Sequence, residues 1–162
     1  MKSKMNEAIA HLFDEQVHLT GVIEYGISWS DLIAGKVMIP PQGARFDISF
    51  EGTLKGEQIN GQIRGVDFLE VRADGRFMLN IQATILTNDG ESIALHEDGV
   101  LTPQQDTGKA DLFLNMKFAC HSEKYNWLNK TNAWAYGQVE MAKGEVVVSA
   151  YSDSRVTEPI LN

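Results

Sequence analysis

The sequence predicts an all-β protein: an antiparallel meander of about eight to ten strands closed into a barrel, with one or two short helices. Three observations predict it. Apolar and polar residues alternate over long stretches, glycine-rich tight turns follow one another, and no convincing helix separates the strands. Strands joined by tight turns pair antiparallel, whereas parallel strands need a long crossover connection. Closure removes exposed strand edges, so we expect a barrel; a two-sheet sandwich is the alternative that the pattern leaves open.

The clearest alternation covers residues 46–54. Phe46, Ile48 and Phe50 occupy every second position, with polar residues between them. Successive side chains of a strand point to opposite faces, so this stretch predicts a strand with one buried face. Residues 76–87 show a second, longer alternation of the same kind.

Turn signals then divide the chain into hairpins. Ala-Asp-Gly at 73–75 separates strands 68–72 and 76–87, Asn-Asp-Gly at 88–90 separates the latter from strand 91–97, and Lys-Gly at 143–144 separates strands 133–141 and 145–151. Glycine supplies the positive φ that hairpin turns require. We expect short helices at 5–13 and 30–34, a helix or irregular corner at 122–130, and extended loops at 40–41 and 98–108.

Length and composition indicate one globular domain over residues 1–162, with residues 1–10 as a short helix or disordered arm and 153–162 as a tail. The chain is 43% hydrophobic and 22% charged, which is not the composition of a disordered protein. No apolar run is long enough to span a bilayer, and the N-terminus does not resemble a secretory signal. We therefore expect a cytoplasmic protein with no membrane partner.

Charge and motif content exclude several function classes. The net charge is −8 and no basic cluster stands out, which argues against nucleic-acid binding. A single cysteine permits no intrachain disulfide and no thiolate zinc cluster, and the four histidines form no metal-binding pair. Phosphate loops, dinucleotide-binding glycine motifs and serine-hydrolase elbows are absent, so we expect no cofactor and no metal.

Residues 52–151 resemble the family catalogued as domain of unknown function 3237, also called uncharacterised protein family 0311. The matching residues are Gly56, Gly61, Asp67-Phe68, the Val-Arg-Ala-Asp-Gly run at 71–75, Leu79, Thr84, Thr-Asn-Asp-Gly at 87–90, Ile93 and Tyr-Asn-Trp-Leu-Asn at 125–129. The resemblance implies a lipocalin-like β-barrel with a central cavity, and little about activity. Three positions depart from the family pattern: Phe68 stands where tryptophan is usual, and Asn80 and Gln82 stand where an aspartate and an arginine are usual.

The polar face of strand 76–87 is the first candidate site. Asn80, Gln82 and Thr84 share this face. It is either a solvated outer face or a polar patch inside the lumen, where the amides would orient a ligand. Asp67 either binds turn amides or, in an apolar cavity, has a raised pKa and acts as a general base. His96 is either a surface residue or its acid–base partner.

The aromatic residues near the last hairpin form a second candidate group. Trp127, Trp134 and Tyr136 serve either as core packing or as a stacking wall for a ligand. Asn129 either caps a corner or contacts the ligand. Cys120, at the end of an apolar strand, is expected to be an inert buried thiol.

Three functional hypotheses follow. The first is a barrel that binds a small apolar or aromatic molecule through Asp67, Asn80, Gln82, Thr84, Trp127, Asn129 and Trp134. The second is a cofactor-independent isomerase, cyclase or lyase in which Asp67 or His96 moves a proton. The third is a structural or oligomerisation module, a homodimer built on the apolar strand 145–150.

Overall fold

The computed structural model describes residues 9–153. Eight strands account for most of this region: β1 (Ile9–Glu24), β2 (Ala44–Lys55), β3 (Gly61–Val71), β4 (Phe77–Thr87), β5 (Ser92–Pro103), β6 (Lys109–Ala119), β7 (Asn132–Glu140) and β8 (Glu145–Asp153). The helical segments are the α-helix α1 (Trp29–Ile33) and the 3₁₀ helix η1 (Asn126–Lys130). In the described part of the chain, no helix has the length and apolar character needed to cross a bilayer.

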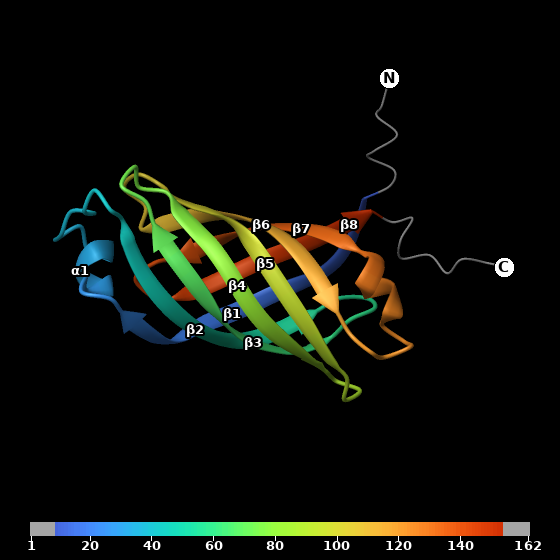
Figure 1. The fold of residues 1–162 in the computed structure, drawn as a ribbon. Coiled ribbons are helices and arrows are strands. Elements are labelled where there is room, and N and C mark those ends of the chain that lie inside the picture. The colour runs from blue at the N-terminus through green and yellow to red at the C-terminus, as the bar shows by residue number, and fades with distance from the viewer. Residues whose placement is uncertain (1–8, 154–162) are drawn as a thin grey trace, which may run out of the picture.

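The eight strands form a closed barrel (Figure 1). Each strand pairs antiparallel with the next in sequence, and β8 pairs with β1 through a register that includes Glu15 opposite Val148. The predicted antiparallel barrel is confirmed, with eight strands, and the two-sheet sandwich is wrong. Closure leaves every strand hydrogen-bonded on both sides, which removes the edges that an open sheet would expose.

The two ends of the barrel are built differently. At one end, here called the α1 end, the β1–β2 connection carries α1 and lies beside the β3–β4, β5–β6 and β7–β8 turns. At the other end, the η1 end, the β6–β7 connection carries η1 and lies beside the β2–β3 and β4–β5 turns (Figure 1).

The predicted hairpins at 73–75, 88–90 and 143–144 are confirmed as strand connections. Gly75 and Gly90 have φ values of 89° and 92°, a conformation that L residues rarely adopt. The long loop predicted at 98–108 is wrong for its first half, because β5 continues to Pro103 and pairs with β6 along this length.

The helix predicted at 5–13 is wrong for residues 9–13, which form the start of β1; residues 1–8 lie outside the described region. Phe13 and Val17 point inward while Asp14 and Gln16 are exposed, the period of two that a strand requires. Residues 9–13 pair with β8, and pairing of β1 with β2 begins at Asp14, so tertiary pairing overrides the local helix propensity of this segment. Asp153 ends β8, and the rest of the expected tail lies outside the described region.

The half of the barrel at the η1 end is filled with apolar side chains. Phe13, Leu54, Ile85 and Ile93 are fully buried there, and Leu128 enters from η1 as a plug with no exposed surface. An interior of this kind is close-packed and leaves no room for a ligand. Any internal space therefore lies in the half nearer the α1 end.

Candidate functional site

A cavity of about 80 Å³ occupies the lumen on the α1 side of this packed core. All eight strands contribute to it, together with Trp29 of α1 and Met141 after β7. The lining is apolar except for three carboxyl side chains, and comprises Glu15, Val17, Leu19, Trp29, Ile48, Phe50, Asp67, Leu79, Ile81, Glu97, Leu101, Leu112, Leu114, Val139, Met141, Val146 and Val148. An eight-stranded barrel is just wide enough to hold one small ligand.

The three carboxyls point inward because each occupies a position in phase with apolar core residues. Glu15 lies between Phe13 and Val17 on the inward face of β1. Glu97 follows Leu95 by two residues on β5, and Asp67 precedes Leu69 by two on β3. The alternation that buries the apolar residues therefore buries the acids as well.

The strand register places Asp67 and Glu97 on either side of the same residue of β4. Asp67 and Glu97 both pair with Ile81, from opposite sides of β4. Two strand spacings separate them along the wall, roughly 10 Å between Cα atoms. Glu15 projects from β1, and its charge and that of Asp67 both act on Glu97. The carboxyls thus form one electrostatic cluster.

Burial dominates the electrostatics of Glu15 and Glu97. Their exposed fractions are 3% and 2%, and neither Glu15 Oε2 nor Glu97 Oε1 has a hydrogen-bond partner. Loss of solvation raises the pKa of Glu15 to about 7. The pKa of Glu97 is raised well above its usual value by burial, and further by the charges of Glu15 and Asp67.

Asp67 differs from the two glutamates in its hydrogen bonding. The backbone N–H of Asn80 donates to its Oδ1 at 3.0 Å. Burial nevertheless raises the pKa of Asp67 to about 7, because desolvation outweighs that hydrogen bond and the attraction of Arg45. Among the residues that the structure describes, no lysine, arginine or histidine lines the cavity. Near neutral pH the cluster therefore holds protons that ordinary surface carboxyls would have lost.

The α1 helix covers the open end of the cavity. Trp29 packs edge-on against Phe46 and Phe77, with ring centroids 4.9 and 6.2 Å away. The Glu24 carboxylate accepts the backbone N–H of Trp29, and the Ser28 hydroxyl caps the helix by accepting the N–H of Asp31 at 3.2 Å. These contacts hold the indole over the mouth of the lumen.

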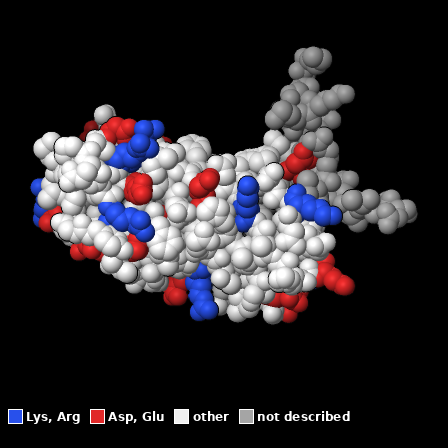
Figure 2. All heavy atoms as spheres, viewed as in Figure 1, with Lys and Arg blue, Asp and Glu red and all other residues white. Residues whose placement is uncertain are grey.

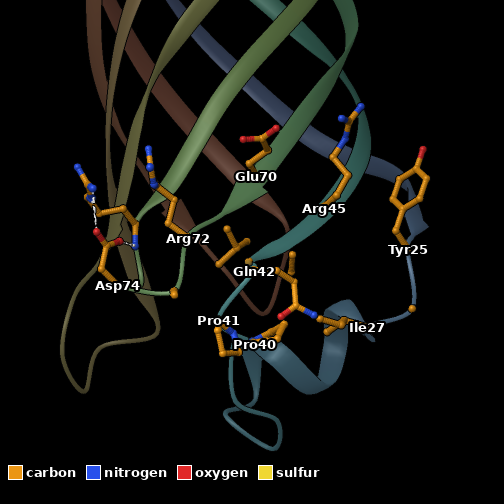
Figure 3. Close-up of a pocket in the computed structure, with 15 residues that line it drawn as sticks. Tyr25, Ile27, Pro40, Pro41, Gln42, Arg45, Glu70, Arg72 and Asp74 are labelled. Atoms are coloured by element: carbon orange, nitrogen blue, oxygen red, sulfur yellow. Dashed lines mark hydrogen bonds and ion pairs between the residues drawn. The ribbon is translucent and has the colours of Figure 1, made fainter.

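A larger groove of about 870 Å³ lies outside the barrel at the α1 end (Figure 3). Arg45 and Arg72 extend along the barrel wall, away from the loop that carries Pro40 and Pro41. Its charges are balanced locally, since Arg45 binds Asp47 and Arg76 binds Asp74, each at 2.8 Å. Acidic and basic side chains are likewise interspersed on the face shown in Figure 2. The lumen, with two unpartnered carboxyl oxygens on Glu15 and Glu97, is the better candidate site.

Of the site residues predicted from the sequence, Asp67 alone lines the lumen. Asn80, Gln82 and Thr84 are exposed on the outer wall, so of the two alternatives the structure shows the solvated outer face. The opposite face of β4, which is apolar and includes Leu79 and Ile81, points into the lumen. His96 also lies on the outer wall, where its Nδ1 is 2.7 Å from Gln82 Nε2. Asp67 and His96 are therefore not brought together.

The remaining predicted residues lie on the outer wall or at the η1 end, away from the cavity lining. Trp134 is 40% exposed on β7, and Trp127 is half-buried within η1. Asn129 fixes the corner before η1: its Oδ1 accepts the Cys120 N–H at 2.8 Å and its Nδ2 donates to the Cys120 carbonyl at 2.9 Å. Of the two roles considered for Asn129, these hydrogen bonds correspond to capping a corner of the backbone. The half-buried Cys120 thiol donates to the Tyr125 carbonyl.

Sequence reasoning missed Glu15 and did not single out Glu97 as a site residue. A signal was present in both cases: an acidic residue at a position in phase with apolar neighbours of a strand. Within residues 9–153, no group of three or more His, Cys, Asp or Glu side chains is arranged to hold a metal ion. The chemistry that the cluster offers is proton transfer and hydrogen bonding.

Fold and cavity together define a closed antiparallel β-barrel protein with carboxyl groups inside an apolar lumen. Residues 33–152 match the family described as "Protein of unknown function (DUF3237)". The chain therefore belongs to this family, as the sequence resemblance indicates.

Solved structures share the fold. A beta-barrel like protein from Acinetobacter baumannii is 24% identical, with a TM-score of 0.72 over 89% of this chain and 94% of that one. A protein of unknown function from Clostridium acetobutylicum is 20% identical, with a TM-score of 0.73 over 90% and 96% of the two chains. An enzyme from Penicillium herquei is 21% identical, with a TM-score of 0.59 over 90% and 92%.

One curated protein is similar in sequence. Hydroalkoxylation enzyme phnH of Penicillium herquei is 31% identical over 84 residues, which are 51% of this chain and 50% of that protein. The chain thus spans about half the length of the curated relative it matches.

Proposed function

We propose that the lumen is the active site of a cofactor-independent enzyme that moves protons to and from a small, largely apolar molecule. The observation that carries the proposal is the cluster of Glu15, Asp67 and Glu97 inside an otherwise apolar cavity. A general acid or base works best when its pKa lies near the operating pH, and burial raises the pKa values of Glu15 and Asp67 to about 7.

The differences among the carboxyls suggest distinct roles. Glu97 has an oxygen without a partner and the charges of two neighbouring acids acting on it, so it is the group best suited to donate a proton. Asp67 accepts a backbone N–H, which favours its ionised form and suits it to receive a proton. Pairs of acids whose environments differ in this way divide acid and base work in many enzymes.

The curated relative supports this reaction class. Hydroalkoxylation adds an O–H bond across a carbon–carbon double bond. In such a reaction Glu97 would give its proton to one alkene carbon, the substrate hydroxyl oxygen would bond to the other carbon, and the hydroxyl proton would pass to the Asp67 carboxylate. One proton enters the substrate and one leaves it, so no oxidant or cofactor is consumed.

A direct test uses a small alkenol, 4-methylpent-3-en-1-ol, in D₂O at a pH near 6. We expect the wild-type protein to form 2,2-dimethyltetrahydrofuran with one deuterium on the former alkene carbon, as measured by gas chromatography and mass spectrometry. Glu97→Gln should lose most of this activity, while Asp98→Asn, a neighbouring acid on the outer wall, should keep it. Equal conversion by wild type, Glu97→Gln and buffer would refute the proposal.

A binding protein without catalysis is the second candidate. The observation that favours it is the indole of Trp29 over the cavity, since a carrier must retain its ligand. Native mass spectrometry of the freshly purified protein distinguishes the two: a carrier retains a stoichiometric small molecule that is lost on denaturation, whereas an enzyme releases its product.

The homodimer predicted on strand 145–150 stays a prediction. The structure reduces the apolar surface that this strand could offer to a partner subunit. Val146 and Val148 line the lumen. Of the three valines, Val147 alone, which is 53% exposed, is then available to contact a partner subunit. Light scattering at working concentration tests it: a monomer mass would rule out this assembly.

A further inference from the structure

The cavity presents three acids and no base. Glu15, Asp67 and Glu97 line it, and the other lining residues carry hydrocarbon, indole or thioether side chains. Within residues 9–153 no cationic side chain on the lining balances the acids, and the three carboxyls are the titratable groups of that lining. A negative charge in such an apolar setting is costly until a positive partner arrives.

Two oxygen atoms in this cluster have no hydrogen-bond donor. Glu15 Oε2 and Glu97 Oε1 are buried and without partners, although both side chains belong to the wall of the cavity. Buried polar atoms are nearly always paired in folded proteins, and exceptions commonly mark a place for a ligand or an ion. A ligand in the lumen that carries a hydrogen-bond donor would satisfy these oxygens.

We infer that the lumen is built for a small organic cation, an apolar group that carries a protonated amine or develops positive charge during reaction. A primary ammonium offers three N–H donors, more than the two unpartnered oxygens, Glu15 Oε2 and Glu97 Oε1, require. A neutral alcohol offers one donor, and a carboxylate offers none and is repelled by every acid of the cluster that is ionised.

Size and shape restrict the cation further. At roughly 10–15 Å³ for each water-sized group, the cavity has space for about five to eight such groups. Val17, Ile48 and Leu112 give the hydrocarbon part an apolar wall. Trp29 at the mouth adds an aromatic ring, a surface that also attracts cations.

This inference rests on the site of the proposed function and deepens it. Protonation of a carbon–carbon double bond creates a positive charge on carbon. Carboxylates held in place around that charge stabilise it without needing to reorganise. A stable cation of similar shape should then bind more tightly than the neutral molecule, as transition-state analogues do.

Three ligands of matched shape test the inference with the full-length protein: isobutylamine, isobutanol and isobutyrate. We expect isothermal titration calorimetry or NMR titration near pH 7.5 to show the ammonium binding at least about tenfold more tightly than the alcohol, and the carboxylate not binding. Equal or tighter binding of the alcohol would overturn the inference, and so would the absence of binding by all three ligands at their solubility limits.

Single substitutions test whether the lumen acids cause the preference for the ammonium over the alcohol. Glu15→Gln and Glu97→Gln should each reduce the ratio of ammonium to alcohol affinity several-fold, whereas Asp98→Asn, on the outer wall of the same strand as Glu97, should leave it unchanged. Circular dichroism confirms that each variant is folded, and Asp67→Asn replaces any glutamate variant that is not. An unchanged ratio in all folded lumen variants would overturn the inference.

The binding experiment and the turnover experiment test the two proposals independently. A cation preference without conversion of the alkenol would refute the proposed enzyme and leave the inference intact. Conversion of the alkenol with no preference for the ammonium would refute the inference and leave the enzyme intact.

Discussion

The buried carboxyl of Asp67 makes the stability of the barrel depend on pH in an unusual direction. Its pKa is raised from 3.8 to about 7 in the folded protein. The native state therefore holds a proton that the unfolded state has lost between these two values. Stability is highest below the unfolded pKa and falls as the pH rises toward 7, by about 1.4 kcal/mol for each pH unit. Over the whole interval of about three units, Asp67 costs about 4 kcal/mol.

Asp67→Asn isolates this contribution. The amide oxygen of asparagine can still accept the Asn80 N–H, but the side chain no longer titrates. Between pH 5 and 6.5 the unfolding free energy of the wild type should fall more steeply than that of the variant, by about 1.4 kcal/mol per pH unit. At pH 8 the variant should be the more stable protein by several kcal/mol, up to about 4.

Urea denaturation followed by tryptophan fluorescence, repeated at each pH from 5 to 8, measures the two slopes. Asp98→Asn is the matched control: it removes an acid two strands away, on β5, from the outer wall instead of the lumen. The control should follow the wild type throughout. Parallel pH profiles for Asp67→Asn and the wild type would refute the reasoning, because they would mean that the carboxyl has the same pKa in both states.

Three further predictions, two of them with a control variant, test the architecture around the site. Trp29→Ala should open the mouth of the lumen, lower the unfolding free energy by about 2 kcal/mol and increase binding of a hydrophobic dye, measured by fluorescence; unchanged dye binding would contradict a covering role. A Cβ atom at Gly99 would lie 1.9 Å from the Phe113 carbonyl oxygen, so Gly99→Ala should lower the unfolding free energy by several kcal/mol. A Cβ atom at Gly21 would have no atom within 4 Å, so Gly21→Ala should change the unfolding free energy by less than about 1 kcal/mol in the same urea assay. Leu128→Ala should cost about 2–5 kcal/mol because the plug is fully buried, and Leu86→Ala, half-exposed on the outer wall, should cost far less; similar losses for both would contradict the packed η1 end.

The antiparallel barrel could be predicted because its determinants are local. Alternation from Phe46 to Phe50 and the glycine turns at 75 and 90 each act within a few residues, and the structure confirms them. The first strand was missed because residues 9–13 carry no local turn signal. They become a strand through pairing with β8, a partner more than a hundred residues away in the chain.

The candidate site was only partly predictable because strand alternation does not say which face is inside. On β4 the face of Leu79 and Ile81 is apolar, and the other face is polar in its middle and apolar at its ends, so the pattern leaves open which face lines the lumen. Asp67 is a candidate from the sequence because it directly follows Gly65 and Val66 and is one of the residues shared with the family. Glu97 and Glu15 carry the same signal, yet pairing of the three acids across the lumen depends on barrel closure, which no local pattern encodes.

The two halves of the barrel show what the carboxyls cost and why their position matters. At the η1 end, fully buried side chains such as Ile85, Ile93 and Leu128 stabilise the fold. Halfway along the lumen the same inward positions carry Glu15, Asp67 and Glu97, whose burial lowers stability at neutral pH. Leucine or methionine at these positions would stabilise the barrel, since apolar replacements of buried ionisable groups often do. A stable fold needs none of the three acids, and their retention in spite of this cost supports the function proposed for the cavity that they line.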